Sequence, residues 1–349
     1  MTDQSTYDPS STRHASPSRR DALRITAVAG LGVAVGAAAL RELIERATLH
    51  RVSVTRTQLG TAVTVTVLDA DPAEGRTLVD SAFAEIEHLE RLLSRYRKQS
   101  AVARLNRDGV LRPAPPELVH VVSRAHEYAR LSDGAFDITV APLLNLYTQR
   151  FRDGLPEPSE AEVARAHALV NWRDLTVDDK SVALARRGMA ITLDGIAKGY
   201  VVDRAVSTLV ERGADRVIVQ AGGDASTADT TDEPWRIAIQ DPHDPEGVLG
   251  IVDLHGSVAS SGDYMQAFTP DRRLNHIIDP RTGRSPERSS GTTVLAPSAL
   301  DADAASTAAF VLGPEAGVTF LDKLDDIRGI VVSKDGMRFA SKGFDGEMV

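Results

Sequence analysis

The pattern of hydrophobic and polar positions changes from segment to segment after residue 50 and predicts a mixture of strands and helices. From Val52 to Leu68, β-branched residues alternate with polar ones around Leu59-Gly60-Thr61, which indicates two strands or one kinked strand. From Ala73 to Tyr96, apolar residues recur at spacings of three and four, the period of an amphipathic helix. The same patterns predict helices over 116–131, 159–169, 197–212 and 301–312, strands over 189–193 and 216–220, and a short extended segment over 135–139.

Residues typical of helix ends support several of these boundaries. Ser159 with Glu162 three positions later fits a capping box, and Gly213 and Gly313 follow the expected ends of two other helices. Short strands dominate from residue 216 to about residue 295, and we see no internal repeat. The mixture predicts an α+β fold with a single catalytic unit.

The first 40 residues differ from the rest in composition. Residues 1–24 are rich in Ser, Thr, Arg and Asp and lack apolar periodicity, which is typical of a disordered leader. The pair Arg19-Arg20 precedes an uncharged segment, residues 25–40, in which Ala37-Ala38-Ala39 offers a small-residue cleavage site. This order predicts a twin-arginine export signal and a location in the periplasm or on the outer face of the cytoplasmic membrane.

Residues 25–40 allow two other interpretations, a membrane anchor or a buried helix. Sixteen residues are short for a membrane span, and the glycines disfavour a soluble core helix. The sequence leaves open whether the signal is cleaved or retained, with membrane association through this segment.

Composition narrows the function classes. The 349 residues include 40 Lys and Arg against 49 Asp and Glu; without residues 1–39 the balance is 36 to 46, a net charge of −10, which argues against nucleic acid as a partner. Cysteine is absent, so no disulfide framework is available. Walker, Rossmann and HExxH motifs are also missing, which disfavours nucleoside triphosphatases, nicotinamide dehydrogenases and the usual zinc hydrolases.

The run from Leu193 to Asp203 combines a strand end, a glycine turn, a lysine and a helix start. Such a turn aims backbone N–H groups and the Lys198 ammonium at a phosphate. Two further turns, Gly222-Gly223-Asp224 and Ser261-Gly262-Asp263, each follow an apolar strand, and turn chemistry alone can explain them.

Two polar groups near the C-terminal end carry candidate chemistry. Asp303, Ser306 and Thr307 share one face of the expected helix and offer the hard oxygen ligands that Mg²⁺ prefers, although Asp303 can equally favour the first helical turn as a structural charge. His276 precedes Asp279 and a Pro-Arg-Thr-Gly turn, and it is either a base or a partly buried residue of a hairpin.

Taken in order, these motifs resemble the ApbE family, the FAD:protein FMN transferases, from about residue 52 to about residue 342. The matching segments are Leu59-Gly60-Thr61, Leu93-Ser94-Arg95-Tyr96 with Leu105-Asn106, Gly134-Ala135-Phe136-Asp137, Gly195 to Tyr200 with Asp203, Gly222-Gly223-Asp224, Ser260 to Tyr264, His276 to Gly283, and Asp301 to Gly313. The resemblance implies an ApbE-like fold, related to the T-fold, with mixed sheets and packed helices.

The resemblance also implies the site residues. Those expected to contact the flavin or adenine are Leu59, Tyr96, Ala135, Phe136, Asp137, Thr192, Lys198 and Ile278. Those expected to hold Mg²⁺ are Asp303, Thr307, Ser306 and the Gly195 carbonyl. One departure concerns the glycine turn, where the family's usual aspartate falls on Thr192 and a new one stands at Asp194.

The implied reaction is a Mg²⁺-dependent transfer of FMN from FAD to a Ser or Thr hydroxyl of an exported acceptor protein, with release of AMP. His276 and Asp279 are the candidate bases, and Tyr96 and Tyr264 offer aromatic faces to the flavin. An FAD pyrophosphatase and a non-catalytic exported FAD-binding protein remain alternative hypotheses.

Overall fold

The computed structural model describes residues 49–69, 71–229 and 233–348. The predicted leader and export segment, residues 1–40, lie outside the described residues. His50 to Val349 form one unit, whose centre is an eight-stranded antiparallel sheet in the order β1-β2-β6-β7-β10-β11-β12-β13. Its strands are β1 (His50–Gln58), β2 (Thr61–Asp69), β6 (Arg216–Ala221), β7 (Asp224–Asp229), β10 (Ser257–Gly262), β11 (Ser289–Ala296), β12 (Arg328–Ser333) and β13 (Arg338–Ala340).

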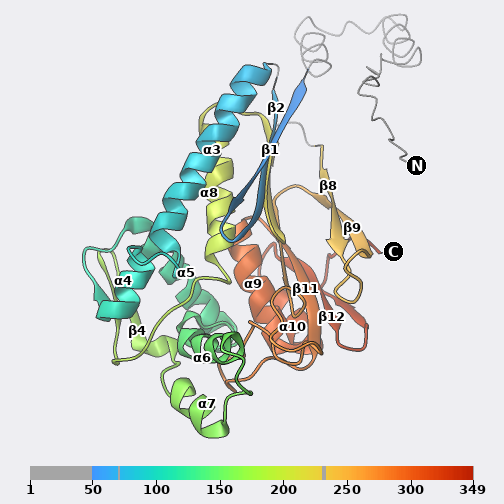
Figure 1. The fold of residues 1–349 in the computed structure, drawn as a ribbon. Coiled ribbons are helices and arrows are strands. Elements are labelled where there is room, and N and C mark those ends of the chain that lie inside the picture. The colour runs from blue at the N-terminus through green and yellow to red at the C-terminus, as the bar shows by residue number, and fades with distance from the viewer. Residues whose placement is uncertain (1–48, 70, 230–232, 349) are drawn as a thin grey trace, which may run out of the picture. The chain divides into compact units, whose positions relative to one another are not determined.

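Four helices pack along this sheet (Figure 1). Helix α3 contacts β1 and β2, α8 contacts β6 and β7, α9 contacts β10 and β11, and α10 contacts β12 and β13. These helices are α3 (Pro72–Leu93), α8 (Ala197–Glu211), α9 (Ala299–Leu312) and α10 (Pro314–Leu321). The main hydrophobic core lies between them and the sheet.

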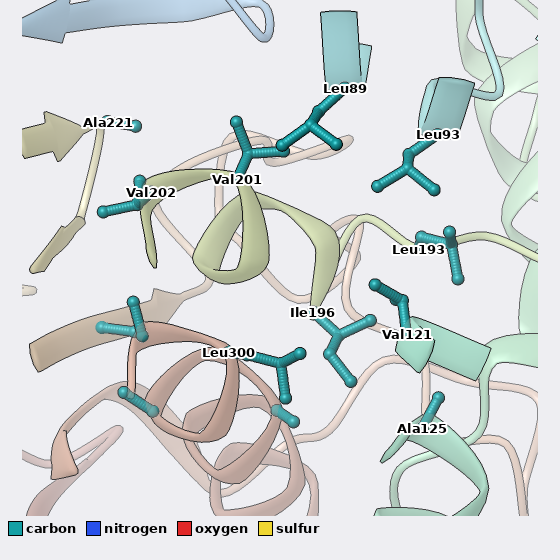
Figure 2. Packing of buried hydrophobic residues seen from close by; sticks show 14 of the residues in the cluster. Leu89, Leu93, Val121, Ala125, Leu193, Ile196, Val201, Val202, Ala221 and Leu300 are labelled. Atoms are coloured by element: carbon teal, nitrogen blue, oxygen red, sulfur yellow. The ribbon is translucent and has the colours of Figure 1, made fainter. Parts of the chain in front are cut away.

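Helix α8 lies at the centre of this core. Figure 2 shows Val201 and Leu89 pointing toward one another from α8 and α3, and Ile196 and Leu300 close together at the start of α8 and α9. A Cβ atom at Gly199 would lie 2.0 Å from the backbone oxygen of Ala299, so only glycine permits this approach of α8 to α9. The close approach brings Lys198, one residue earlier, to α9.

A second hydrophobic cluster joins the large sheet to a small antiparallel sheet in the order β14-β9-β8. Its members include Ile218 and Val258 of the large sheet and Ile239 and Val252 of the small one. The small sheet consists of β8 (Trp235–Gln240), β9 (Val248–Leu254) and β14 (Glu347–Met348).

The remaining elements extend the helical side. They are α4 (Ala101–Asp108), β3 (Val110–Leu111), α5 (Pro116–Leu131), the 3-10 helix η1 (Ile138–Val140), α6 (Ala141–Arg152), α7 (Glu160–His167), the 3-10 helix η2 (Trp172–Asp174), β4 (Leu175–Asp178) and β5 (Ser181–Leu184). Strands β3, β5 and β4 form a third small sheet. None of the helices among the described residues is long and apolar enough to cross a membrane.

The predicted α+β class is confirmed, and most predicted helices are present. The 52–68 segment is a two-stranded hairpin, the helix 116–131 has the predicted bounds, and Ser159 forms its capping box with Glu162. The strand predicted over 189–193 is wrong, because the side chain of Asn106 binds both backbone groups of Ile191, at 2.7 and 2.8 Å. The extended segment predicted over 135–139 is also wrong, because Asp137 caps the 3-10 helix η1 there.

Candidate active site

The glycine turn, residues 194–196, lies directly before α8 and is held by its neighbours. Asn106 fixes Ile191 on one side, and Thr192 donates its backbone N–H to the Ile138 carbonyl at 2.8 Å. The Thr192 hydroxyl accepts a hydrogen bond from the Asp194 backbone at 3.2 Å and is buried. Thr192 therefore stabilises the turn, while the Asp194 carboxylate is partly exposed.

One carboxylate binds the ammonium of Lys198, and the charges of two others act on it. Its Nζ lies 3.0 Å from Asp224 Oδ2, and the negative charges of Asp224, Asp303 and Asp194 all act on it. Burial alone would lower the pKa of Lys198, but these charges outweigh burial, so its pKa is raised and the lysine stays charged. Arg95 lies 3.5 Å from Asp194, so Lys198 remains as the cation for two buried carboxylates, Asp224 and Asp303.

Asp303 is the carboxylate of this cluster that lies on α9, and it is buried. Its Oδ2 accepts a hydrogen bond from the Gly199 backbone at 3.2 Å. Burial, and then the charge of Asp224, raise the pKa of Asp303 well above its usual range, although Lys198 opposes this shift. Binding of a second cation would stabilise the ionised form of this buried carboxylate.

The hydroxyls that follow Asp303 on α9 face the strand β10. Ser261 Oγ lies 2.8 Å from Ser306 Oγ and 3.2 Å from Thr307 Oγ1. A Cβ atom at Gly195 would lie 3.0 Å from Thr307 Oγ1 and 3.5 Å from Phe136. The structure therefore brings the glycine turn, Phe136 and the polar face of α9 together.

These oxygens are of the chemical kind that a hard divalent cation prefers. The described residues contain no group of three or more His, Cys, Asp or Glu side chains with metal-binding geometry. The predicted set instead combines one carboxylate, Asp303, with the hydroxyls of Ser306 and Thr307 and the Gly195 carbonyl, a composition that suits Mg²⁺ completed by water or phosphate oxygens. Lys198 pairs with Asp224, and a further cation would favour the ionised form of Asp303.

The rim of the site is formed by the end of α3 and the turn. The Tyr96 hydroxyl lies 3.4 Å and Arg95 Nη1 lies 3.5 Å from Asp194 Oδ2. The Arg95 guanidinium also lies 5.2 Å from the centre of the Tyr96 ring, which is 74% exposed. Asp194, the residue that departs from the family pattern, thus holds an exposed aromatic ring beside the glycine turn.

Leu59 lies in the β1–β2 turn with a φ of 54°, and its backbone N–H donates to Glu90 Oε2 at 3.3 Å. Glu90 also pairs with Arg97, the residue after Tyr96. This chain of contacts connects Leu59 to the rim.

Asp137 has a structural use that the sequence did not reveal. Its carboxylate accepts hydrogen bonds from the Thr139 backbone and hydroxyl, both at 2.7 Å, and from the Trp172 backbone at 2.9 Å. Ala135 and Phe136 are buried, and Ala135 packs against Phe310. Phe136 lies next to the glycine turn, where its ring would be 3.5 Å from a Cβ atom at Gly195.

His276 and Asp279 lie in very different settings. His276 is partly buried, its buried Nδ1 atom has no hydrogen-bond partner among the described residues, and the charges of Asp194 and Lys198 both act on it. Burial lowers the pKa of His276, so the ring is mostly neutral near pH 7. Asp279 instead binds Arg281 through both carboxylate oxygens at 2.8 Å.

Ile278 lies between these two residues, and its side chain is buried in a cluster with Leu143 and Tyr147. The residues that the structure brings together are therefore Lys198, Gly195, Phe136, Asp303, Ser306 and Thr307, with Tyr96 and His276 coupled to them through Asp194.

Sequence reasoning missed the roles of Asp224 and Ser261. Both follow or end apolar strands and were explained as turn residues, yet Asp224 pairs with Lys198 and Ser261 contacts Ser306 and Thr307. Each contact joins a strand to a separate helix, so residue spacing gave no signal for either of them.

The fold and this site define an α+β protein with a buried polar centre, in which one lysine pairs with Asp224 and the charges of two further carboxylates act on it. The model described as the ApbE family matches residues 59–331, and the chain therefore belongs to this family. The predicted family, a family of transferase enzymes, is confirmed.

Relatives support this assignment over most of the chain. The FAD:protein FMN transferase of Escherichia coli (strain K12) is 31% identical over 294 residues, which cover 80% of this chain and 84% of that protein. The FAD:protein FMN transferase of Treponema pallidum (strain Nichols) is 30% identical over 323 residues, or 85% and 89% of the two chains.

Solved structures give the same result for the fold. The ApbE protein of Thermotoga maritima superposes with a TM-score of 0.77 at 29% identity and covers 84% of this chain and 98% of its own. The apo form of the Pseudomonas stutzeri flavinyl transferase ApbE has a TM-score of 0.74 at 31% identity, with coverage of 85% and 96%. The predicted ApbE-like fold is confirmed.

Proposed function

We propose that this protein is an FAD:protein FMN transferase that uses Mg²⁺, attaches FMN from FAD to a Ser or Thr hydroxyl of an acceptor protein, and releases AMP. The observation that carries the proposal is the convergence of Lys198, Asp224 and Asp303 beside the glycine turn. A lysine that stays charged and a cluster with excess negative charge suit a pyrophosphate bound together with a divalent cation.

In this proposal, Asp303, Thr307, Ser306 and the Gly195 carbonyl would hold Mg²⁺, which would supply charge neutralisation and Lewis acidity at the FAD pyrophosphate. Lys198 binds a phosphate oxygen and is itself held by Asp224. Tyr96 presents its exposed ring to the flavin or adenine, and Arg95 and Asp194 orient that ring.

The reaction forms a bond between the acceptor hydroxyl oxygen and the FMN phosphorus. The bond from that phosphorus to the bridging pyrophosphate oxygen breaks, and the oxygen leaves with AMP. His276 takes the proton of the hydroxyl, because its Nδ1 atom is unpartnered among the described residues and its lowered pKa keeps the ring neutral. Asp279 is the weaker candidate, since both oxygens of its carboxylate accept hydrogen bonds from Arg281.

We also propose export by the twin-arginine route, with activity in the periplasm or on the outer face of the cytoplasmic membrane. This part of the proposal depends on Arg19-Arg20 and the apolar segment 25–40, which lie outside the described residues. The acceptor would then be an exported protein.

One experiment tests the transfer reaction. The mature protein is incubated with FAD, Mg²⁺ and an exported FMN-binding acceptor domain, flavin fluorescence on the acceptor is detected after denaturing electrophoresis, and AMP is measured in parallel. The proposal expects labelled acceptor and one AMP for each flavin attached. AMP without labelled acceptor would instead identify an FAD pyrophosphatase, and bound but unchanged FAD a non-catalytic FAD-binding protein.

A further inference from the structure

The segment from Asp263 to His276 leaves the end of β10 and carries two residues of the site region. Within it, the backbone N–H of His276 binds the Gln266 carbonyl at 3.0 Å, and that of Phe268 binds the Leu274 carbonyl at 2.8 Å. These bonds close the segment on itself as a loop. They do not by themselves fix the loop against the rest of the protein.

Asp263 supplies a fixed point at the start of this loop. Its side chain is 2% exposed, and it forms an ion pair with Lys334 of the turn between β12 and β13. Arg272, from the far side of the same loop, lies 3.7 Å from Asp263 Oδ1. One buried carboxylate therefore joins two cations from different parts of the chain, and removal of either partner would leave part of its charge uncompensated.

Arg272 adds two more connections. Its Nη1 donates to the Pro242 carbonyl at 2.6 Å, and its own carbonyl lies 3.5 Å from Lys334 Nζ. Its φ of 57° is uncommon for a residue other than glycine, so contacts outside the residue must maintain this conformation. Lys334 contacts both Asp263 and the Arg272 carbonyl, which closes the loop at two points.

The loop carries Tyr264 and His276, two residues of the site region. A Cβ atom at Gly262 would lie 2.1 Å from the Tyr264 ring, so the ring packs directly on the β10 backbone. The charge of Lys198 acts on both Tyr264 and His276. A shift of the loop would therefore move both residues relative to Lys198.

We propose that Lys334 and Arg272, by binding the buried carboxylate of Asp263, form a latch that holds the loop 263–276 and thereby positions Tyr264 and His276. Lys334 is a positioning residue of the site and lies beyond residues 59–331, the span of the family match. The role assigned to His276 rests on the proposed function, whereas the latch itself does not.

The test compares two variants. Lys334→Met has a side chain of similar length without the charge, and Lys334→Arg keeps a cation at this position. Lys323→Met is the matched control, because Lys323 is an exposed lysine in the turn after α10. Amide hydrogen exchange of residues 264–276 reports on the loop, and kcat and KM for FAD are measured at saturating acceptor. Urea unfolding measures global stability separately.

We expect Lys334→Met to speed amide exchange in the loop and to lower kcat by about 10-fold through misplacement of His276, while Lys334→Arg recovers most of both. Lys323→Met should change neither. Unchanged exchange in Lys334→Met would overturn the latch, and faster exchange with unchanged kcat would overturn the positioning role. If the wild-type protein transfers no flavin, the proposed function fails, and the exchange comparison still decides whether the latch exists.

Discussion

The Lys198 ammonium lies 3.0 Å from the carboxylate of Asp224, whose side chain is fully buried. This pair joins the first turn of α8 to the start of β7. Lys198 therefore has two roles that experiments can separate, since it compensates a buried charge and it is proposed to bind phosphate.

Lys198→Met should destabilise the protein by about 3 kcal/mol, because Asp224 would then be buried without its cation. Urea unfolding measures this change, and FAD titration should show a loss of binding. The double variant Lys198→Met, Asp224→Asn removes both charges and should recover most of the stability but no FAD affinity. Recovery of FAD binding in the double variant would contradict the phosphate-binding role.

Asp303→Asn should abolish flavin transfer, with a loss on the order of 100-fold or more in kcat, because it removes the charged ligand proposed for Mg²⁺. The free energy of unfolding of this variant should not fall with its activity and should instead equal or exceed that of the wild type. The raised pKa of Asp303 means that its ionised form is disfavoured in the folded protein, so this contribution favours folding at low pH and is lost as the pH rises.

Thermal unfolding in EDTA at neutral pH should therefore show Asp303→Asn to be at least as stable as the wild type. Addition of Mg²⁺ at about 100 times its Kd should stabilise the wild type by roughly 2.7 kcal/mol and leave the variant unchanged. Equal stabilisation of both proteins by Mg²⁺ would show that Asp303 is not a ligand.

The sequence predicted elements whose cause is local. The capping box of Ser159 and Glu162 and the helix Pro116–Leu131 follow from contacts between near neighbours in the chain, and both are present. The segment 189–193 is apolar and looks like a strand, but Asn106, 85 positions earlier, takes the hydrogen bonds that a neighbouring strand would need. A contact over that distance leaves no periodicity in the sequence.

The contacts of the site also divide into those set by local spacing and those set by residues far apart in the sequence. Spacing on a helix indicated that Asp303, Ser306 and Thr307 share a face, because one helix determines that relationship. The partnership of Lys198 with Asp224 and of Ser261 with Ser306 depends on which strands lie beside which helices. The order of strands in the sheet, with β7 next to β10, sets these contacts, and residue spacing does not reveal it.

The pH dependence of kcat/KM for FAD, measured at saturating Mg²⁺, should show an acid limb below pH 6.5, because burial lowers the pKa of His276 from that ordinary value. The rate falls on this limb as the base becomes protonated. His276→Asn should reduce the rate by about 10³-fold and remove the limb. His255→Asn, which changes an exposed histidine after β9, should keep both the rate and the limb. Persistence of the limb in His276→Asn would assign it to another group.

Asp137 allows a test of stability that does not depend on FAD. Burial raises its pKa from 3.8 to about 6, although the hydrogen bonds from Thr139 and Trp172 oppose the shift. A carboxyl group with a raised pKa favours folding fully below pH 3.8, and this contribution is lost as the pH rises through about 6. The difference of about 2 pKa units corresponds to at most about 3 kcal/mol.

Urea unfolding of the wild type and of Asp137→Asn should therefore give stability curves that converge or cross between pH 4 and pH 6, since asparagine does not titrate. Parallel curves would show that the carboxyl group has an ordinary pKa in the folded protein. The same variant tests the predicted FAD contact. Because both Asp137 oxygens already accept hydrogen bonds from the protein, Asp137→Asn should weaken FAD binding far less than Lys198→Met does. An equal loss of affinity would mean that Asp137 leaves its capping position when FAD binds.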